Sequence, residues 1–105
     1  MLMQKESRTT NSRHVAWVRG LPCAASSLTC NGGTQAHHLL RPWVGGRGMG
    51  MKADDRNVIP LCLFHHSQLH TKYGSENSFF TVHARDDGYA QELAEHLWQD
   101  SPYHR

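Results

Sequence analysis

The sequence predicts a small α+β domain with a zinc knuckle and additional C-terminal helices. The chain has 105 residues, a length at which a hydrophobic core alone is marginal and a bound metal ion is a common remedy. Five of its nine histidines fall in two short clusters, and its three cysteines lie between or beside these clusters. Histidine and thiolate are the commonest transition-metal ligands, so this arrangement predicts metal sites.

The N-terminal half is expected to contain an arm, a helix, a knuckle and a strand. Residues 1–13 are mostly polar and are predicted to form a flexible arm, followed by a single domain over residues 14–105. Asn11 or Ser12 can cap the first helix, and Gly20 can end it. The predicted elements are a helix over residues 14–19, a turn-rich zinc knuckle over residues 21–33, and a short strand over residues 34–40.

The C-terminal half begins with a glycine-rich loop and continues as helices. Residues 41–56 hold four glycines and four basic residues, and a loop this long in a small domain is usually functional or disordered. Asp54 and Asp55 can cap or brace this loop. The predicted helices are one from Pro60 to about Lys72, a turn capped by Ser75, and a last helix capped by Asp86 or Asp87, with Tyr89, Leu93 and Leu97 on its core face.

His66 and His70 are spaced to bind one metal ion together. On a helix, residues i and i+4 share a face with their Cβ atoms about 5–6 Å apart, which suits two imidazoles that converge on one ion. His37 is the natural third ligand, which leaves His38 without a metal ion. Three ligands would form an open site, with positions left for water and substrate.

A second set of ligands has the composition of a closed, structural zinc site. Cys62 and His65 form a Cys-x2-His half-site, and Cys23 and Cys30 supply the other half, which gives a Cys3His set for tetrahedral zinc. Two alternatives remain open at this point. Either a single zinc site leaves the other histidines unliganded, or the chain has only buried and surface histidines and free thiols.

The composition favours a cytoplasmic protein without a membrane partner. No segment approaches the roughly 20 apolar residues that cross a bilayer, and the first residues lack the apolar core of a signal peptide. An odd number of cysteines at metal-ligand spacings argues against disulfides and for a reducing compartment. The net charge of +2 is compatible with a polyanionic partner but does not establish one.

The order of these motifs resembles that of the HNH, or ββα-metal, endonuclease family. The three family motifs are matched, in chain order, by His37 with His38, by Asn57, and by His66 with His70. The structural zinc ligands that flank the motif in many members are matched by Cys23, Cys30, Cys62 and His65. The stretch from Trp17 to His70 also resembles a phage-encoded subgroup, which includes a nuclease that acts with the host recombinase filament.

This resemblance implies a small ββα-metal enzyme that hydrolyses phosphodiester bonds of DNA. His38 would activate water as a general base, and Asn57 would fix the loop that orients His38. Mg²⁺ or another divalent ion would be held by His37, His66 and His70, apart from the structural Zn²⁺. The hairpin of this fold is distorted, so exchanged roles for His37 and His38 remain an alternative. A host recombinase filament or another phage protein is an implied partner.

Binding of DNA would depend on contacts with phosphate. The sequence has no recognisable helix-turn-helix, finger array or cluster of base-reading side chains. The expected phosphate-binding residues are Arg41, Arg47, Lys52 and Arg56 around the loop, and Lys5, Arg8 and Arg13 in the arm. Two other classes of function remain open: a non-catalytic zinc-bound module for nucleic acid or protein, and a metal-dependent hydrolase of small phosphoesters.

Overall fold

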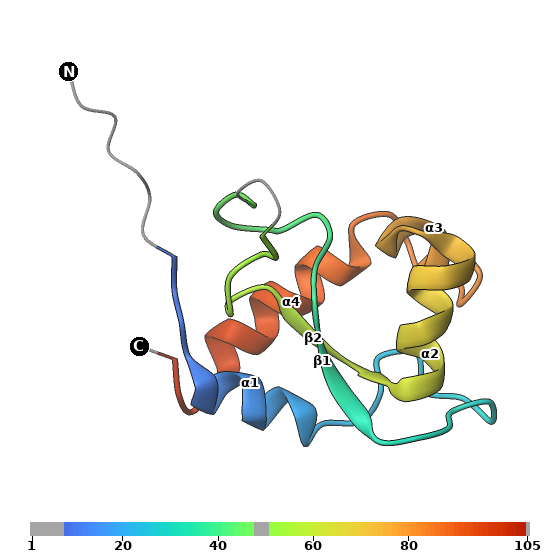
Figure 1. Ribbon diagram of the computed structural model, residues 1–105, viewed down its shortest axis with the longest axis horizontal. Coiled ribbons are helices and arrows are strands. Elements are labelled where there is room, and N and C mark those ends of the chain that lie inside the picture. Colours follow the sequence, from blue (N-terminus) through green and yellow to red (C-terminus); the bar gives the residue numbers. More distant parts are fainter. Residues whose placement is uncertain (1–7, 48–50, 105) are drawn as a thin grey trace.

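The protein folds as a two-stranded antiparallel sheet surrounded by helices, which confirms the predicted α+β class (Figure 1). The computed structural model describes residues 8–47 and 51–104. Lys5 of the predicted arm, and Gly48 and Gly50 of the predicted loop, lie outside these ranges. The elements are α1 (Ser12–Arg19), β1 (Thr34–His38), β2 (Val58–Cys62), α2 (Leu63–Gln68), the π-helix η1 (Leu69–Tyr73), α3 (Glu76–Thr81) and α4 (Tyr89–Asp100).

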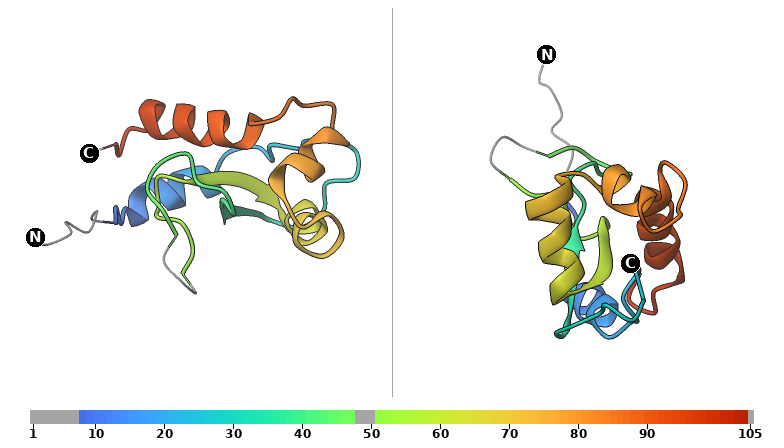
Figure 2. Two further views of the ribbon diagram at one scale, coloured as in Figure 1. Left: turned by 90° about the horizontal axis from the view of Figure 1, so that it is seen from above. Right: turned by 90° about the vertical axis from the view of Figure 1, so that its right-hand side faces the viewer.

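The sheet forms the centre of the molecule. Thr34 pairs with Cys62 at one end of the two strands, and His38 pairs with Val58 at the other. The sheet lies between the α2–η1 helix on one side and α4 on the other (Figure 2). Every residue of β2 is buried as a result, and the core around it contains Leu39, Ile59, Leu61, Leu69, Phe79, Phe80, Ala90 and Ala94.

The predicted helix start at Pro60 is wrong, because Pro60 belongs to β2. Pro60 pairs with Ala36, and its carbonyl accepts a hydrogen bond from Ala24 N at 2.8 Å. A strand of a two-stranded sheet has a free edge, where a residue without an N–H group is tolerated. The helix begins instead at Leu63, and the Cys62 thiol caps it by accepting a hydrogen bond from His65 N at 3.4 Å.

The first helix begins two residues earlier than predicted, at Ser12. Asn11 is its cap, because the side chain accepts a hydrogen bond from His14 N at 2.9 Å. The preceding Thr9 is hydrogen-bonded to Asp54 and Asp55. The last residues of the predicted arm are therefore part of the domain.

The last helix also begins differently from the prediction. Gly88 precedes it with a φ of 81°, and neither Asp86 nor Asp87 caps it. Its fully buried face carries Ala90, Ala94 and Trp98, whereas Leu93 is only partly buried. Ser75 caps α3, as predicted, and Gly74 ends η1 in the left-handed conformation. None of the helices in the described ranges is long and apolar enough to cross a membrane.

Candidate metal centres

The three cysteines and His65 converge in a Cys3His cluster that fits a metal ion such as zinc. His65 Nδ1 lies 3.5 Å from Cys23 Sγ, 3.6 Å from Cys30 Sγ and 3.2 Å from Cys62 Sγ. Tetrahedral zinc, with bonds of about 2.3 Å to sulfur and about 2.0 Å to nitrogen, would separate these atoms by about 3.5 Å. The wide spacing between Cys23 and Cys30 in the sequence is therefore no obstacle to a common site.

Backbone hydrogen bonds hold the knuckle against the start of α2. Leu63 N donates to Gly33 O, and Phe64 N donates to Asn31 O, both at 3.0 Å. Gly32, between these residues, has a φ of +83°, and a Cβ atom there would lie 2.5 Å from Leu63 Cβ. Only glycine satisfies both conditions, so the turn that the sequence predicts at residues 31–33 has a steric cause.

The surroundings of the Cys3His cluster affect the protonation of its ligands. Burial raises the pKa of the Cys23 thiol to about 11. Burial also opposes ionisation of Cys62, but hydrogen bonds, led by that from His65 N, outweigh it and lower its pKa. Since zinc binds thiolate, loading of the cluster must release a proton from Cys23. On the far side of the His65 ring, Nε2 lies 3.0 Å from Thr29 Oγ1.

A second cluster joins His37 of β1 with His66 and His70 of the α2–η1 helix. The candidate ligand atoms of these three residues all lie within 4.8 Å of one another. His66 Nε2 and His70 Nε2 are 3.2 Å apart, and metal–nitrogen bonds of about 2.0–2.1 Å would separate two ligands by about 2.9–3.4 Å. The structure thus brings together the three histidines that the sequence predicts as one ligand set.

Two acceptors determine which nitrogen of these rings is available to a metal. Glu76 Oε2 lies 2.8 Å from His37 Nε2, and Gln35 Oε1 lies 2.6 Å from His66 Nδ1. An ionised carboxylate and an amide oxygen only accept, so these two nitrogens carry the protons. The lone pairs are then on His37 Nδ1 and His66 Nε2. Acceptors of this kind typically orient histidine ligands in metal sites.

Glu76 is a residue of this site that sequence reasoning missed. Its carboxylate is 1% exposed and also accepts hydrogen bonds from Leu40 N and Arg41 N. Burial opposes its ionisation, but the bonds from His37 and Leu40 outweigh this effect and hold its pKa below the ordinary value. In the sequence, Glu76 follows the cap Ser75, where an acidic residue is common in the first turn of a helix, so nothing there indicates a contact with a metal ligand.

Burial favours the neutral form of the two helix histidines of this cluster, His66 and His70. Burial lowers the pKa of His66 to about 4, with further contributions from His37 and His70. Burial also lowers the pKa of His70, assisted by His37 and opposed by Glu76. Since a metal ion binds the neutral ring, these residues need not lose a proton at neutral pH to become ligands.

His38 lies outside this ligand set and contacts the loop. Its Nε2 lies 2.9 Å from Asp55 Oδ1, and the two side chains are 14% and 18% exposed. His38 does not belong to the ligand set formed by His37, His66 and His70. The two adjacent histidines thus have different partners, as alternation along a strand predicts.

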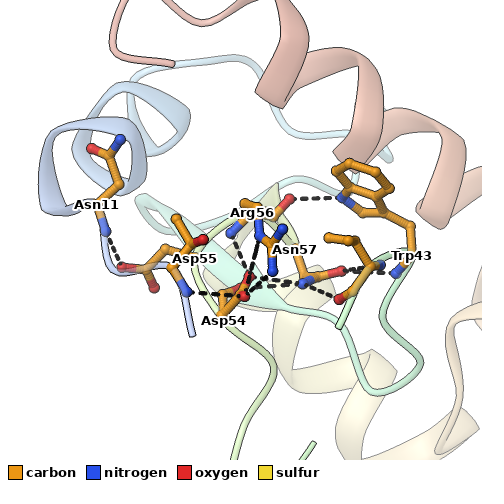
Figure 3. A network of polar contacts seen from close by, with 8 residues as sticks. Asn11, Trp43, Asp54, Asp55, Arg56 and Asn57 are labelled. Carbon is orange, nitrogen blue, oxygen red and sulfur yellow. Dashed lines mark hydrogen bonds and ion pairs between the residues drawn. The ribbon is translucent and has the colours of Figure 1, made fainter. Parts of the chain in front are cut away.

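Asn57 fastens both ends of the loop between the strands (Figure 3). Its side-chain oxygen accepts hydrogen bonds from Trp43 N at 2.8 Å and Val44 N at 3.4 Å, and its amide donates to Asp54 Oδ1 at 3.1 Å. The backbone carbonyl of Asn57 also accepts a hydrogen bond, at 2.8 Å, from the N–H group of Leu39, the residue after His38. Asn57 lies within the loop network and is not among the ligands of either cluster.

The basic residues of the loop have unequal surroundings. Arg41, Arg47 and Lys52 are exposed, and Arg47 donates hydrogen bonds to Leu40 O and Met51 O. Arg56 is half-buried and forms an ion pair with Asp54 at 2.6 Å. Burial opposes the ionisation of Asp54, but the bonds from Arg56 and Thr9 lower its pKa. Arg56 is therefore engaged in an ion pair within the domain, whereas the contacts of Arg47 are hydrogen bonds to backbone carbonyls.

Comparison with known proteins assigns the chain to a family. A family model described as "Protein of unknown function (DUF968)" matches residues 1–81. The chain belongs to this DUF968 family. The matched range contains both ligand clusters and Glu76 and ends before α4.

The DUF968 chain is also similar to a curated bacterial protein. It is 37% identical over 83 residues to the uncharacterized protein YdfU of Escherichia coli (strain K12). This similarity covers 72% of the chain but only 22% of the relative. No solved structure matches the chain.

Proposed function

We propose that this DUF968 protein is a metal-dependent endonuclease of the HNH, or ββα-metal, type that hydrolyses phosphodiester bonds of DNA. The observation that carries the proposal is the convergence of His37 from β1 with His66 and His70 from the following helix. His38, next to the first ligand, instead contacts Asp55 of the loop. One group of histidines is thus suited to a metal ion, and another histidine remains for proton transfer.

The ligand set fits a divalent ion with open coordination positions. The candidate ligand atoms of the three imidazoles lie within 4.8 Å of one another, and Glu76 and Gln35 orient two of the rings. A Mg²⁺, Mn²⁺ or similar ion bound there would polarise the phosphate and stabilise the departing 3′ oxygen. The protein residues would set its position before substrate arrives.

His38 would act as the general base. A neutral imidazole can accept a proton from water as the water attacks the phosphate, and His38 lies outside the metal-ligand sets. Asn57 would maintain the loop geometry around His38 through its bonds to Trp43 N and Val44 N. Arg41, Arg47 and Lys52 would contact phosphates of DNA, because they are exposed cations on the same loop.

The Cys3His cluster would hold zinc for structure. It joins the knuckle to the start of the helix that carries His66 and His70. Its four protein ligands leave no position for substrate, which is the arrangement of structural zinc sites. The zinc ion would therefore support the second cluster without taking part in hydrolysis. We propose that another protein, either a recombinase filament or a phage protein, would direct this protein to DNA.

Incubation of supercoiled plasmid with the purified protein tests this proposal. The protein should be dialysed so that it keeps zinc, and then assayed with and without added Mg²⁺ or Mn²⁺. A chelator alone is a poor control, because it would also remove zinc and unfold the domain. Cleavage that requires the added ion supports the proposal. Zinc-loaded protein that binds DNA but cleaves no plasmid, linear duplex or single strand would instead favour the non-catalytic binding module.

A further inference from the structure

The carboxylate of Asp55 is the partner of His38 and lies in the loop before β2. Asp55 Oδ1 is 2.9 Å from His38 Nε2. The side chains are 14% and 18% exposed, so this contact is largely shielded from water. Asp55 is outside both ligand clusters. Its contact with His38 therefore requires an explanation other than metal binding.

The Asp55 carboxylate is itself fixed by the N-terminal segment. Its second oxygen, Oδ2, accepts a hydrogen bond from Asn11 N at 2.8 Å (Figure 3). Its backbone N–H donates to Thr9 O at 3.0 Å, and Thr9 N donates to the neighbouring Asp54 at 3.1 Å. Asn11 also caps α1, so the folded helix determines where its N–H points. Asp55 is thus held at both carboxylate oxygens and at its backbone before any substrate binds.

The hydrogen-bond chemistry of this pair determines the tautomer of His38. An ionised carboxylate has acceptors and no donor, so His38 must donate its Nε2 proton to Asp55. In the neutral ring the other nitrogen, Nδ1, then carries the lone pair. A carboxylate in this position orients the ring and keeps Nδ1 as the nitrogen that can accept a proton.

We propose that Asp55 is the positioning residue for His38 and that it makes Nδ1 the basic nitrogen of the reaction. The inference rests on the proposed function and assigns a further residue to it. The proton taken from water would go to His38 Nδ1, while the proton on Nε2 stays between His38 and Asp55. Thr9 and Asn11 hold the carboxylate in place. A loop residue and the N-terminal segment thus act on the reaction through His38 without contact with substrate.

The test compares Asp55→Asn with Asp55→Glu. The asparagine keeps the size of the side chain but has one oxygen and a donor, so it cannot accept from both His38 Nε2 and Asn11 N. The glutamate keeps two acceptor oxygens. Asp87→Asn is the matched control, because it makes the same change at an exposed residue of the loop before α4. The measurements are kcat and KM on plasmid, the affinity for Mn²⁺, and the ¹⁵N chemical shifts of His38 at neutral pH.

Asp55→Asn should lower kcat by roughly 10²-fold, the usual contribution of general-base catalysis, with KM and Mn²⁺ affinity unchanged. Asp55→Glu should recover part of this loss, and Asp87→Asn should match the wild type. The ¹⁵N shifts should show Nε2–H in the wild type and a loss of this preference in Asp55→Asn. A merely structural role for Asp55 would lower stability but would not shift the tautomer.

The outcomes separate this inference from the proposed function. A wild-type protein that cleaves no DNA refutes the nuclease proposal. The tautomer of His38 then still tests whether Asp55 orients the His38 ring. Wild-type kcat in Asp55→Asn overturns the inference. So does an Nδ1–H tautomer in the wild-type protein, a measurement that remains possible if the variant does not fold.

Discussion

Glu76 and His37 are 39 positions apart in the sequence, and their side chains meet at 2.8 Å in the buried centre of the molecule. This contact joins α3 to the end of β1 and fixes the orientation of a candidate metal ligand. Outer hydrogen-bond partners of this kind typically change metal affinity by about 10- to 100-fold when they are replaced. We therefore expect Glu76 to affect the metal affinity of the second cluster, although it is not itself a ligand.

Glu76→Gln should weaken Mn²⁺ binding by roughly 10- to 100-fold, because it removes the charged acceptor that orients the His37 ring. Calorimetric titration of Mn²⁺ into zinc-loaded protein measures the effect. Glu92→Gln, which changes an exposed residue of α4, is the matched control and should bind Mn²⁺ like the wild type. Equal affinity for Mn²⁺ in both variants would show that Glu76 has no role in the ion site.

His37→Ala, His66→Ala and His70→Ala should each weaken Mn²⁺ or Ni²⁺ binding, whereas His38→Ala should leave it intact. The reason is that the first three residues form one ligand set and His38 lies outside it. The same titration, made on all four variants at constant zinc content, provides the comparison. If His38→Ala loses the ion and His37→Ala keeps it, the assigned roles of the two residues are reversed.

Cys62→Ala should abolish zinc binding and unfold or aggregate the protein, since metal-binding energy is folding energy in a domain of this size. Zinc content and thermal unfolding are the measurements. Ser26→Ala, at an exposed position in the same knuckle, should retain zinc and the wild-type melting temperature. Wild-type protein that carries no zinc as purified, and that melts at the same temperature as Cys62→Ala, would eliminate the structural zinc site.

Asn11→Ala should reduce the free energy of unfolding by about 1 kcal/mol, the usual cost of a lost helix cap. The substitution removes the bond from His14 N to the cap and the bond from Asn11 to Tyr103 O. It keeps the N–H group that binds Asp55. Ser12→Ala is the comparison, because Ser12 is exposed and is not the cap. Denaturant unfolding should show a clear loss only for Asn11→Ala, and an equal loss in both variants would contradict the assigned cap.

Arg47→Ala combined with Lys52→Ala should weaken DNA binding by a similar factor on unrelated sequences. Each phosphate contact that is lost should reduce the salt dependence of log affinity by about 0.9. Arg85→Ala removes one positive charge outside the loop and should leave the slope unaltered. Binding isotherms at several salt concentrations test this expectation. A wild-type protein that prefers one short sequence with little salt effect would show that base contacts dominate.

The parts of the site that could be predicted are those with local periodicity. His66 and His70 are one helical turn apart, and Cys62 and His65 are separated by two residues, so their side chains converge once the helix forms. Asn57 was expected to fix the loop, and its hydrogen bonds to Trp43 and Val44 do so. The mixed α+β class followed from the same local patterns.

The remainder depends on tertiary contacts that no local pattern encodes. Glu76 contacts His37 across 39 positions of the sequence, and Asp55 contacts His38 across 17. From the sequence alone, each carboxylate would be interpreted as a helix cap or a surface residue. Pro60 lies in β2 because the strand has a free edge, although proline usually suits a helix start. Tyr89 and Leu93 pack against the core as predicted, but Ala90 and Ala94 are buried more deeply because α4 packs on β2.

The central claim is that His38 acts as a base beside an ion held by three other histidines. The most direct test is the rate of plasmid cleavage by His38→Ala at saturating Mn²⁺, with folding, zinc content and Mn²⁺ affinity shown to equal those of the wild type. The account predicts a loss of roughly 10²-fold or more in kcat, the range expected when a general base is removed. Cleavage by His38→Ala at the wild-type rate would contradict it.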